Sequence, residues 1–389
     1  MKKLNYPYTI YLFICFFLVA CATPHKAEQR VSQAHYKQVV VPNFDKSNEP
    51  IRVFDTDSTQ LFFDDVNNTT PIAVQGEQMY VLVLSGGGVN GAYGAGVING
   101  LHESNQLPNY SIITGISAGA LMAPFVFVGD ENIKHMKQLI LGIDDKSIIG
   151  KKHFLNTIFK DALSEGQHLY DLIEQHYSDE LIDQISVMHQ QGKRLLIGTT
   201  HFDSNELVVW NIGEIASSQV VNRYKLIRQI IAASASIPAV FPPQFIDVEL
   251  NGETMEEMHV DGGLANQLFL FAEHIDFNAI NSSLGLSTQP VVQVIRNGVL
   301  DMPYQKINDK GIDLITRTVK SMTVNQGEGD LYHIAYMCRQ QNLAMRYTSI
   351  DQQNVPEKGS KDMFDQQYMQ ALFNMGYEKA VNGQLWQRL

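Results

Sequence analysis

The sequence predicts an α/β fold with a mostly parallel central sheet and helices on both faces. Short, continuous apolar runs typical of buried strands alternate along the chain with longer segments of helical character. The first strong run, 79–84, ends in glycines and leads into a glycine-rich segment over 91–103. Of the 389 residues, 44% are hydrophobic and 18% are charged, which allows a sizeable core and excludes a disordered chain.

Each element is expected for a local reason. Predicted strands are apolar runs or hairpin arms beside turn residues, and they cover 51–54, 60–63, 79–84, 110–114, 194–199, 207–212, 245–250, 255–260 and 291–295. Predicted helices are rich in small or apolar residues and cover 91–103, 118–128 and 221–233. The residues after about 300 have a helical, amphipathic pattern.

The N-terminus has the pattern of a targeting segment. Lys2 and Lys3 precede thirteen almost wholly apolar residues, 8–20, which are fewer than the roughly 20 that span a bilayer. The run ends in Leu-Val-Ala before Cys21, which resembles the lipobox of bacterial lipoproteins. That resemblance implies cleavage after residue 20 and a lipid on the Cys21 thiol. An ordinary signal peptide and an uncleaved anchor are the alternatives.

Four segments are therefore expected. A lipoprotein signal peptide over 1–20 precedes a tether with short strands over 21–77, the main α/β domain over 78–297 and a helical C-terminal extension over 298–389. A lipid anchor implies the bacterial cell envelope. Ala22 rather than Asp follows the cysteine, which by resemblance favours the outer membrane in a Gram-negative host.

Charge and cysteine content exclude several classes. The chain has 29 basic and 41 acidic residues, a net charge of -12, without a dense basic cluster, so nucleic acid is not an expected partner. Three cysteines exclude a disulfide framework and a cysteine-rich metal site. Because no calcium-binding loop is evident either, neither a metal nor another cofactor is expected. The oligomeric state is left open.

A glycine turn follows the first strong strand. Gly86, Gly88 and Gly91 have the spacing of a dinucleotide-binding turn, but the next predicted strand lacks the acidic residue that would hold a ribose. A phosphate-binding P-loop is excluded because no Gly-Lys-Ser/Thr follows. The functional interpretation is an oxyanion hole made by the backbone N–H groups of Gly86, Gly87 and Gly88. A plain strand-to-helix turn is the alternative.

A serine lies in the next strand-to-helix turn. Gly115, Ser117 and Gly119 form a G-x-S-x-G sequence between a predicted strand and an apolar helix, the context of a nucleophile elbow. Such a turn exposes the serine hydroxyl at the carboxyl end of the strand, beside a helix N-terminus that favours negative charge. The alternative is a helix-capping serine.

An aspartate ends the second hairpin. Asp261 follows a predicted strand and precedes Gly262 and Gly263, so its carboxylate could act as a general base toward Ser117. Alone, an Asp-Gly pair is a common turn signal. It gains weight from the two motifs before it.

The ordered motifs resemble the patatin-like phospholipase family over about residues 78 to 297. The resemblance implies a three-layer α/β/α fold, Ser117 as nucleophile, Asp261 as base and the glycine N–H groups as oxyanion donors, without a histidine. A further block that resembles the family's site-lining segment is Ala233-Ser234-Ala235-Ser236-Ile237-Pro238-Ala239-Val240-Phe241-Pro242-Pro243. Two departures are Asn90, where the family often has Arg or Lys, and Ser236, where it often has Ala.

The predicted function is hydrolysis of lipid acyl esters, of the phospholipase A or lysophospholipase type, through a covalent acyl-serine. Membrane or micellar lipid is the expected substrate. Alternatives are an acyltransferase, a Ser-His-Asp esterase on the same serine and a non-catalytic lipid-binding lipoprotein. For the triad, His274 and His333 follow Asp261 but lack a suitable loop, and His259 lies two residues before it, where it could tune Asp261.

Overall fold

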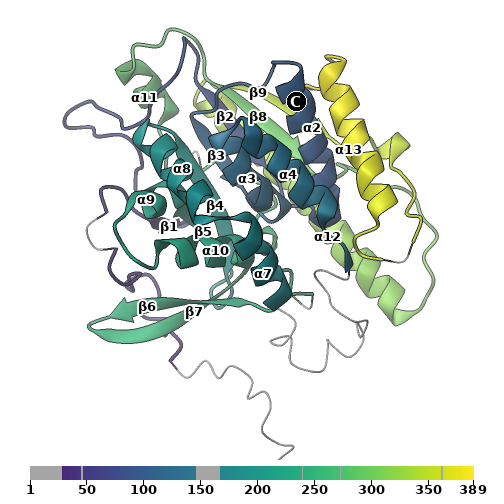
Figure 1. Ribbon diagram of the computed structural model, residues 1–389, viewed down its shortest axis with the longest axis horizontal. Coiled ribbons are helices and arrows are strands. Elements are labelled where there is room, and N and C mark those ends of the chain that lie inside the picture. The colour runs from purple at the N-terminus through teal and green to yellow at the C-terminus, as the bar shows by residue number, and fades with distance from the viewer. Residues whose placement is uncertain (1–28, 45–46, 146–166, 239, 272, 361) are drawn as a thin grey trace, which may run out of the picture.

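The computed structural model describes residues 29–44, 47–145, 167–238, 240–271, 273–360 and 362–389, and these form a three-layer α/β/α structure (Figure 1). A central sheet of nine strands separates two helical layers. This confirms the predicted fold class. The predicted signal peptide over 1–20 and the predicted lipidation site at Cys21 lie outside the described residues.

Five neighbouring strands of the sheet are parallel, in the order β4-β3-β2-β8-β9, with β9 at the edge. Every one of the first four is rich in buried apolar residues, as parallel strands covered on both faces must be. Their bounds are β2 Tyr80–Leu84, β3 Ile112–Gly115, β4 Arg194–His201, β8 Val291–Arg296 and β9 Ala344–Ser349. Because these strands are parallel, their carboxyl ends meet at one edge of the sheet.

Antiparallel strands extend the sheet beyond β4. β5 (Glu206–Asn211) pairs with β4 and with the short edge strand β1 (Arg52–Phe54). A long hairpin is formed by β6 (Gln244–Leu250) and β7 (Glu253–Asp261). It joins the sheet because β7 pairs with the C-terminal end of β4. The hairpin therefore delivers its last residue, Asp261, next to Thr199 of β4.

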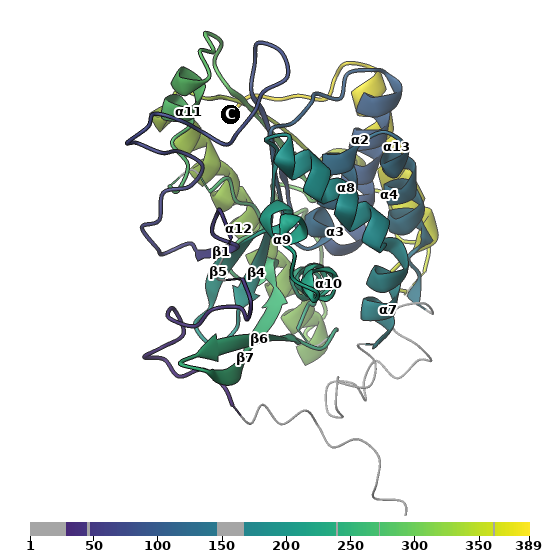
Figure 2. The same cartoon turned by 60° about the vertical axis from the view of Figure 1, so that its left-hand side comes forward.

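Two apolar cores lie on the two faces of the sheet. On β2, Leu82 and Leu84 point into one core and Val81 and Val83 into the other. The larger core is covered by α2 (Gly91–Glu103), α3 (Ala118–Val128), α4 (Glu131–Gly142), α7 (Gln167–His176), α8 (Asp179–Gln190), α9 (Ile212–Ser217), α10 (Arg223–Ser234) and α13 (Gln366–Val381). Figure 2 shows α11 (Phe277–Ser283) and the long α12 (Gly311–Gln340) on the opposite face.

The last helix, α13, packs directly on α2. A Cβ atom added at Gly96 would fall 2.0 Å from the carbonyl oxygen of Phe373, and one at Gly376 would fall 2.2 Å from that of Tyr93. The two helix backbones therefore approach as closely as they do because both positions are glycine. The amphipathic pattern of the C-terminal region here serves packing, and it completes the burial of α2.

Two expectations were wrong. Residues 60–63 are not a strand: Leu61 and Phe62 are buried below the sheet from an irregular segment. The segment 298–389 is not purely helical, because β9 lies in it and pairs in parallel with β8 at the sheet edge. The C-terminal residues thus belong to the same sheet as the predicted catalytic domain.

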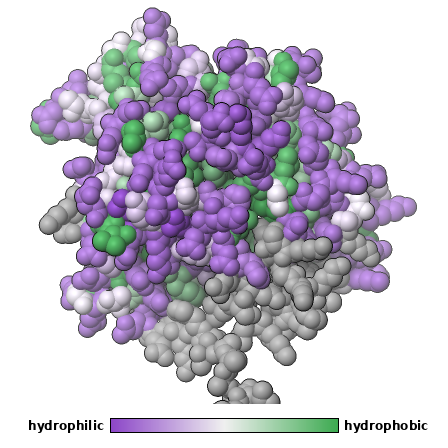
Figure 3. All heavy atoms as spheres, viewed as in Figure 1, coloured by the Kyte–Doolittle hydropathy of each residue, from purple (hydrophilic) through white to green (hydrophobic). Residues whose placement is uncertain are grey.

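The surface of the molecule is mostly polar on the face that Figure 3 shows. On the face seen in Figure 3, hydrophilic residues predominate and hydrophobic residues are scattered among them. Among the described residues, no helix combines the length and the apolar character that crossing a bilayer requires.

Candidate active site

Ser117 lies between the end of β3 and the start of α3, with φ 52° and ψ -119°. This left-handed conformation is rare for a residue with a side chain, so the turn stores strain. Glycines make the turn possible: a Cβ atom at Gly119 would fall 2.3 Å from the carbonyl oxygen of Leu84, and one at Gly115 would fall 2.7 Å from that of Gly119. The expected elbow glycines are therefore sterically required.

Ser234, at the end of α10, holds this turn. Its hydroxyl oxygen accepts a hydrogen bond from the Ser117 backbone nitrogen at 3.0 Å and donates one to the Gly198 carbonyl oxygen at 2.7 Å. The Ser117 N–H is thus satisfied inside the protein. The motif block that resembles the family's site-lining segment contributes to the site through this backbone support.

Asp261 and Ser117 face one another. The Ser117 hydroxyl donates to Asp261 Oδ2 at 2.6 Å, and the Gly263 N–H donates to Asp261 Oδ1 at 2.7 Å. The Asp261 backbone is fixed by two further bonds, from its N–H to the Ser236 carbonyl and from the Thr200 hydroxyl to its own carbonyl. Both side chains are therefore held by strands and helix ends rather than by free loops.

Burial sets the charge properties of the pair. Asp261 is only 4% exposed and Ser117 only 5%. Burial raises the pKa of Asp261 to about 6, against the opposing effect of the hydrogen bonds from Ser117 and Gly263. At neutral pH the carboxylate is ionised yet more basic than an exposed aspartate, which suits a proton acceptor.

The glycine turn after β2 lies beside Ser117. A Cβ atom at Gly86 would fall 3.4 Å from Ser117 Cβ, and one at Gly87 would fall 2.2 Å from the Asn297 carbonyl oxygen. Gly86 was expected to be an oxyanion donor, but its N–H donates to the Gln267 carbonyl oxygen at 3.0 Å, so that expectation was wrong. We find no acceptor among the described residues for the N–H groups of Gly87 and Gly88, which are left as donors.

Three histidines were candidates for a triad, and none of them contacts Ser117. His259 is buried between Thr199 Oγ1 at 3.0 Å and Glu257 Oε2 at 3.2 Å, and burial lowers its pKa. His274 lies within hydrogen-bond distance of two backbone carbonyl oxygens and stacks on Phe271. His333 is exposed on α12 and lies 3.6 Å from Glu273.

Asn90, the departure from the family pattern, faces the C-terminal helix. Its Oδ1 accepts a hydrogen bond from the Tyr368 hydroxyl of α13 at 2.9 Å. Sequence reasoning missed this contact and the hydrogen bond from the Gly86 N–H to the Gln267 carbonyl oxygen. It also did not single out Arg296, which is buried at the carboxyl end of β8; the available signal was a charged residue at the end of a predicted buried strand, where α/β proteins place their sites.

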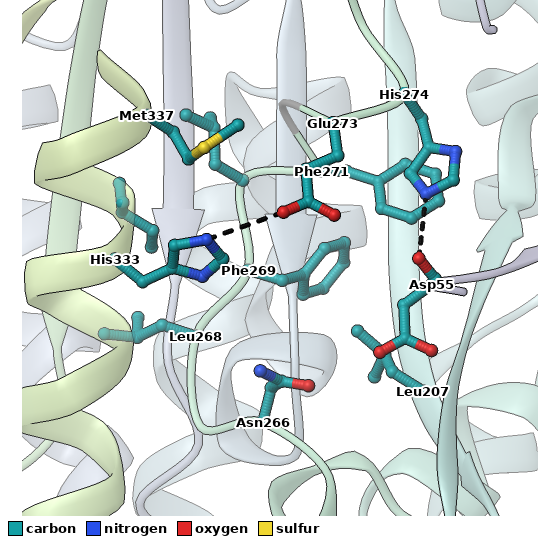
Figure 4. Close-up of a pocket in the computed structure, with 12 residues that line it drawn as sticks. Asp55, Leu207, Asn266, Leu268, Phe269, Phe271, Glu273, His274, His333 and Met337 are labelled. Atoms are coloured by element: carbon teal, nitrogen blue, oxygen red, sulfur yellow. Dashed lines mark hydrogen bonds and ion pairs between the residues drawn. The ribbon is translucent and has the colours of Figure 1, made fainter. Parts of the chain in front are cut away.

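Two other features lie apart from the serine. A cavity of about 100 Å³ between the segment 266–274 and α12 is lined by apolar side chains with His274 and His333, and neither Ser117 nor Asp261 lines it (Figure 4). Glu49, His189 and Glu214 lie close enough together to hold a metal ion. His189 Nε2 lies 3.1 Å from Glu214 Oε2, and Glu49 is paired with Arg194 and Asn211 instead, so the carboxylates already have protein partners.

Residues 82–272 match the family model described as "Patatin-like phospholipase". These residues form a patatin-like phospholipase domain. Ser117 and Asp261 both fall inside the matched segment, whereas Arg296, α12 and α13 follow it.

Similar proteins are distant. Two relatives from Acanthamoeba polyphaga mimivirus carry the name "Uncharacterized protein": L620, 22% identical over 274 residues (60% of this chain, 71% of the relative), and R571, 23% identical over 199 residues (50% and 64%). Among solved structures, VipD from Legionella pneumophila is similar at 14% identity and TM-score 0.38, over 79% of this chain and 67% of VipD. ExoU in complex with SpcU, from the type III secretion system of Pseudomonas aeruginosa, is similar at 15% identity and TM-score 0.30 (81% and 54%).

Proposed function

We propose that the patatin-like domain hydrolyses carboxylic esters of lipids through a Ser117-Asp261 dyad, in the manner of a phospholipase A or lysophospholipase. The observation that carries this proposal is the 2.6 Å hydrogen bond from the Ser117 hydroxyl to the buried Asp261 carboxylate. A hydroxyl that donates to a carboxylate of raised pKa is prepared to lose its proton as it attacks a carbonyl.

The reaction proceeds in two halves. Asp261 accepts the Ser117 proton while Oγ bonds to the ester carbonyl carbon, and the N–H groups of Gly87 and Gly88 stabilise the oxyanion. The tetrahedral intermediate then collapses, the alcohol leaves with the proton returned by Asp261, and an acyl-serine remains. A water molecule, deprotonated by Asp261, attacks this ester, and the free acid leaves while Ser117 recovers its proton.

The test combines a mechanism-based probe with a panel of lipid esters. A fluorophosphonate is expected to label the wild type and not Ser117→Ala, and the same variant is expected to lose ester hydrolysis. Ser282→Ala, an exposed serine whose hydroxyl bonds only to the Asn278 carbonyl in its own helix, is the matched control. Full hydrolysis by Ser117→Ala would exclude the proposed nucleophile, and an unlabelled, inactive wild type would favour a non-catalytic lipid-binding protein.

Two finer parts of the proposal have their own tests. Adding acceptor alcohols and analysing products separates a hydrolase from an acyltransferase that uses the same acyl-serine. We further propose that Cys21 carries the lipid anchor and that the protein resides in the bacterial cell envelope, on the lipobox-like sequence before that cysteine. Metabolic labelling with a fatty-acid analogue, lost in Cys21→Ala, tests the anchor.

A further inference from the structure

A buried arginine lies beneath the glycine turn. Arg296, the last residue of β8, is 2% exposed. Added Cβ atoms at Gly298 and at Gly327 of α12 would fall 3.2 Å and 2.5 Å from its guanidinium carbon, so glycines make room for the group. An arginine buried to this extent needs partners for its charge and its donors.

The guanidinium meets acceptors from three segments. Nη1 lies 3.3 Å from the Gly86 carbonyl oxygen, 3.5 Å from Ser85 Oγ and 3.4 Å from Gln267 Oε1, and Nη2 lies 3.3 Å from the Thr323 carbonyl oxygen. These are long hydrogen bonds, but the donor is charged and buried, which strengthens each of them. Burial lowers the pKa of Arg296 to about 10, so it is a cation at neutral pH.

Asp330 of α12 supplies the opposing charge. Its carboxylate interacts electrostatically with Arg296 and accepts bonds from the backbone N–H groups of Gln267 at 2.6 Å and Leu268 at 3.1 Å. Gln267 in turn accepts from the Gly86 N–H and donates its side chain to the Gly263 carbonyl at 2.7 Å. The hydrogen bonds of Asp330 and Gln267 therefore connect α12 to the glycine turn and to the turn after Asp261.

These contacts act on the orientation of the peptide group between Gly86 and Gly87. In a trans peptide the C=O of Gly86 and the N–H of Gly87 point in opposite directions. The Gly86 carbonyl accepts from the Ser85 hydroxyl at 2.6 Å as well as from Arg296. Two donors that hold this carbonyl on the β8 side thus prevent the peptide from turning over, and a turned peptide would present an oxygen where the Gly87 N–H belongs.

We propose that Arg296 is a positioning residue for the oxyanion hole: it holds the Gly86 carbonyl, so that the Gly87 N–H faces the oxyanion formed at Ser117. This inference rests on the proposed function. It also assigns a role to β8 and α12, which lie beyond the segment 82–272 that matches the family model. In this proposal the cation that stabilises the glycine turn is the buried Arg296, whereas position 90 carries the uncharged Asn90.

The test compares Arg296→Met with Arg194→Met in the full-length protein. Arg194 is also 2% exposed and ion-paired, but it begins β4 at the opposite end of the parallel strands, so it controls for losing a buried cation. With a soluble p-nitrophenyl ester, Arg296→Met is expected to lower kcat about 100-fold, the effect of losing one oxyanion donor, and to leave KM nearly unchanged. Arg194→Met is expected to lower the melting temperature and keep kcat.

Two further readouts separate positioning from simple loss of structure. Arg296→Lys keeps the charge and is expected to restore part of kcat, and the low-pH limb of kcat/KM should stay in place because Asp261 is untouched. If Arg296→Met does not melt cooperatively, Ser85→Ala, which removes the other donor to the Gly86 carbonyl, replaces it and is expected to lower kcat.

The measurements distinguish failure of the positioning role from failure of the proposed function. A kcat for folded Arg296→Met equal to that of Arg194→Met, or an unchanged kcat in Ser85→Ala where that variant is needed, overturns the positioning role. Absence of Ser117-dependent hydrolysis in the wild type overturns the proposed function instead, and it is seen before any Arg296 variant is measured.

Discussion

The hydroxyl of Ser234 joins the Ser117 turn to the sheet: it accepts from the Ser117 N–H at 3.0 Å and donates to the Gly198 carbonyl at 2.7 Å. Both of its partners, Ser117 and Gly198, are buried. The turn that carries Ser117 has a strained left-handed φ, and a strained turn persists only where its surroundings hold it. Ser234 is therefore part of what holds the hydroxyl of Ser117 toward Asp261.

Replacing Ser234 by alanine is expected to lower both stability and activity. The change leaves a buried N–H and a buried carbonyl with one partner fewer, which costs about 1–3 kcal/mol in free energy of unfolding. It also lets the turn relax, so kcat should fall. Urea denaturation and ester hydrolysis measure the two effects. Ser282→Ala is the control, and an unchanged kcat in folded Ser234→Ala would contradict the role.

The activity should depend on the ionisation of Asp261. Only the carboxylate accepts the Ser117 proton, and its pKa is raised to about 6 by burial. Below this pH, kcat/KM should fall about tenfold for each pH unit, and above it kcat/KM should reach a plateau. A profile from pH 4 to 8 with a soluble ester measures this. A profile flat down to pH 4 would mean that Asp261 is not the base.

The same burial should make Asp261 destabilising at high pH. Its pKa rises from 3.8 in the unfolded chain to about 6 in the folded protein, so it binds protons more tightly when folded and its contribution to stability is lost as pH rises through 6. A pKa difference of about 2 corresponds to about 3 kcal/mol. Asp261→Asn, inactive, should therefore be more stable than wild type at pH 8 by up to about that amount.

The pH dependence of this gain is its own control. Between pH 6 and pH 4 the stability advantage of Asp261→Asn should shrink. In this range the wild-type carboxyl takes up a proton on folding and no longer carries a buried charge. Urea denaturation of both proteins at pH 4, 6 and 8 provides the comparison. A stability difference that stays constant with pH would show that it does not arise from the carboxylate charge.

Much of the fold could be predicted because its signals are local. The helices over 91–103 and 118–128 were predicted at their observed bounds, since each starts at a glycine turn that ends a buried strand. Strand β9 was missed because its sequence, with Arg346 and polar residues among apolar ones, has no continuous apolar run. Its place in the sheet comes from pairing with β8, about 50 residues earlier in the chain.

In the candidate site, too, the residues in local motifs could be predicted and the contacts that depend on tertiary packing could not. Ser117 and Asp261 lie in short motifs, and the structure brings their side chains together. The commitment of the Gly86 N–H to Gln267 was not predictable, because it depends on how the turn after Asp261 packs against the glycine turn. The contacts of Arg296 with Thr323 and of Asp330 with Gln267 are likewise tertiary, and their residues carry no motif.

Gly87 should tolerate no side chain. A Cβ atom there would meet backbone and Cβ atoms of Asn297 at 2.2 and 2.6 Å, which cannot move aside as a flexible side chain would. Gly87→Ala is therefore expected to displace the turn and to lower kcat at least 100-fold, as does loss of an oxyanion donor. Gly329→Ala, on an open face of α12, is the control and should add about 1 kcal/mol of stability with kcat unchanged. Wild-type kcat in Gly87→Ala would argue against this turn as the oxyanion hole.

Histidine should not be needed for the chemistry. His259, His274 and His333 have partners other than Ser117, so replacing each by glutamine should leave kcat within about threefold, less than the 100-fold or more that general-base catalysis contributes. His259→Gln is expected to lower stability, because it disturbs a fully buried bond to Glu257. The pH profile adds a second readout: a histidine base would also give a limb near pH 6, and only for that base would a glutamine variant remove it. Loss of the limb, or of activity, in any one folded variant would favour a Ser-His-Asp esterase over the dyad.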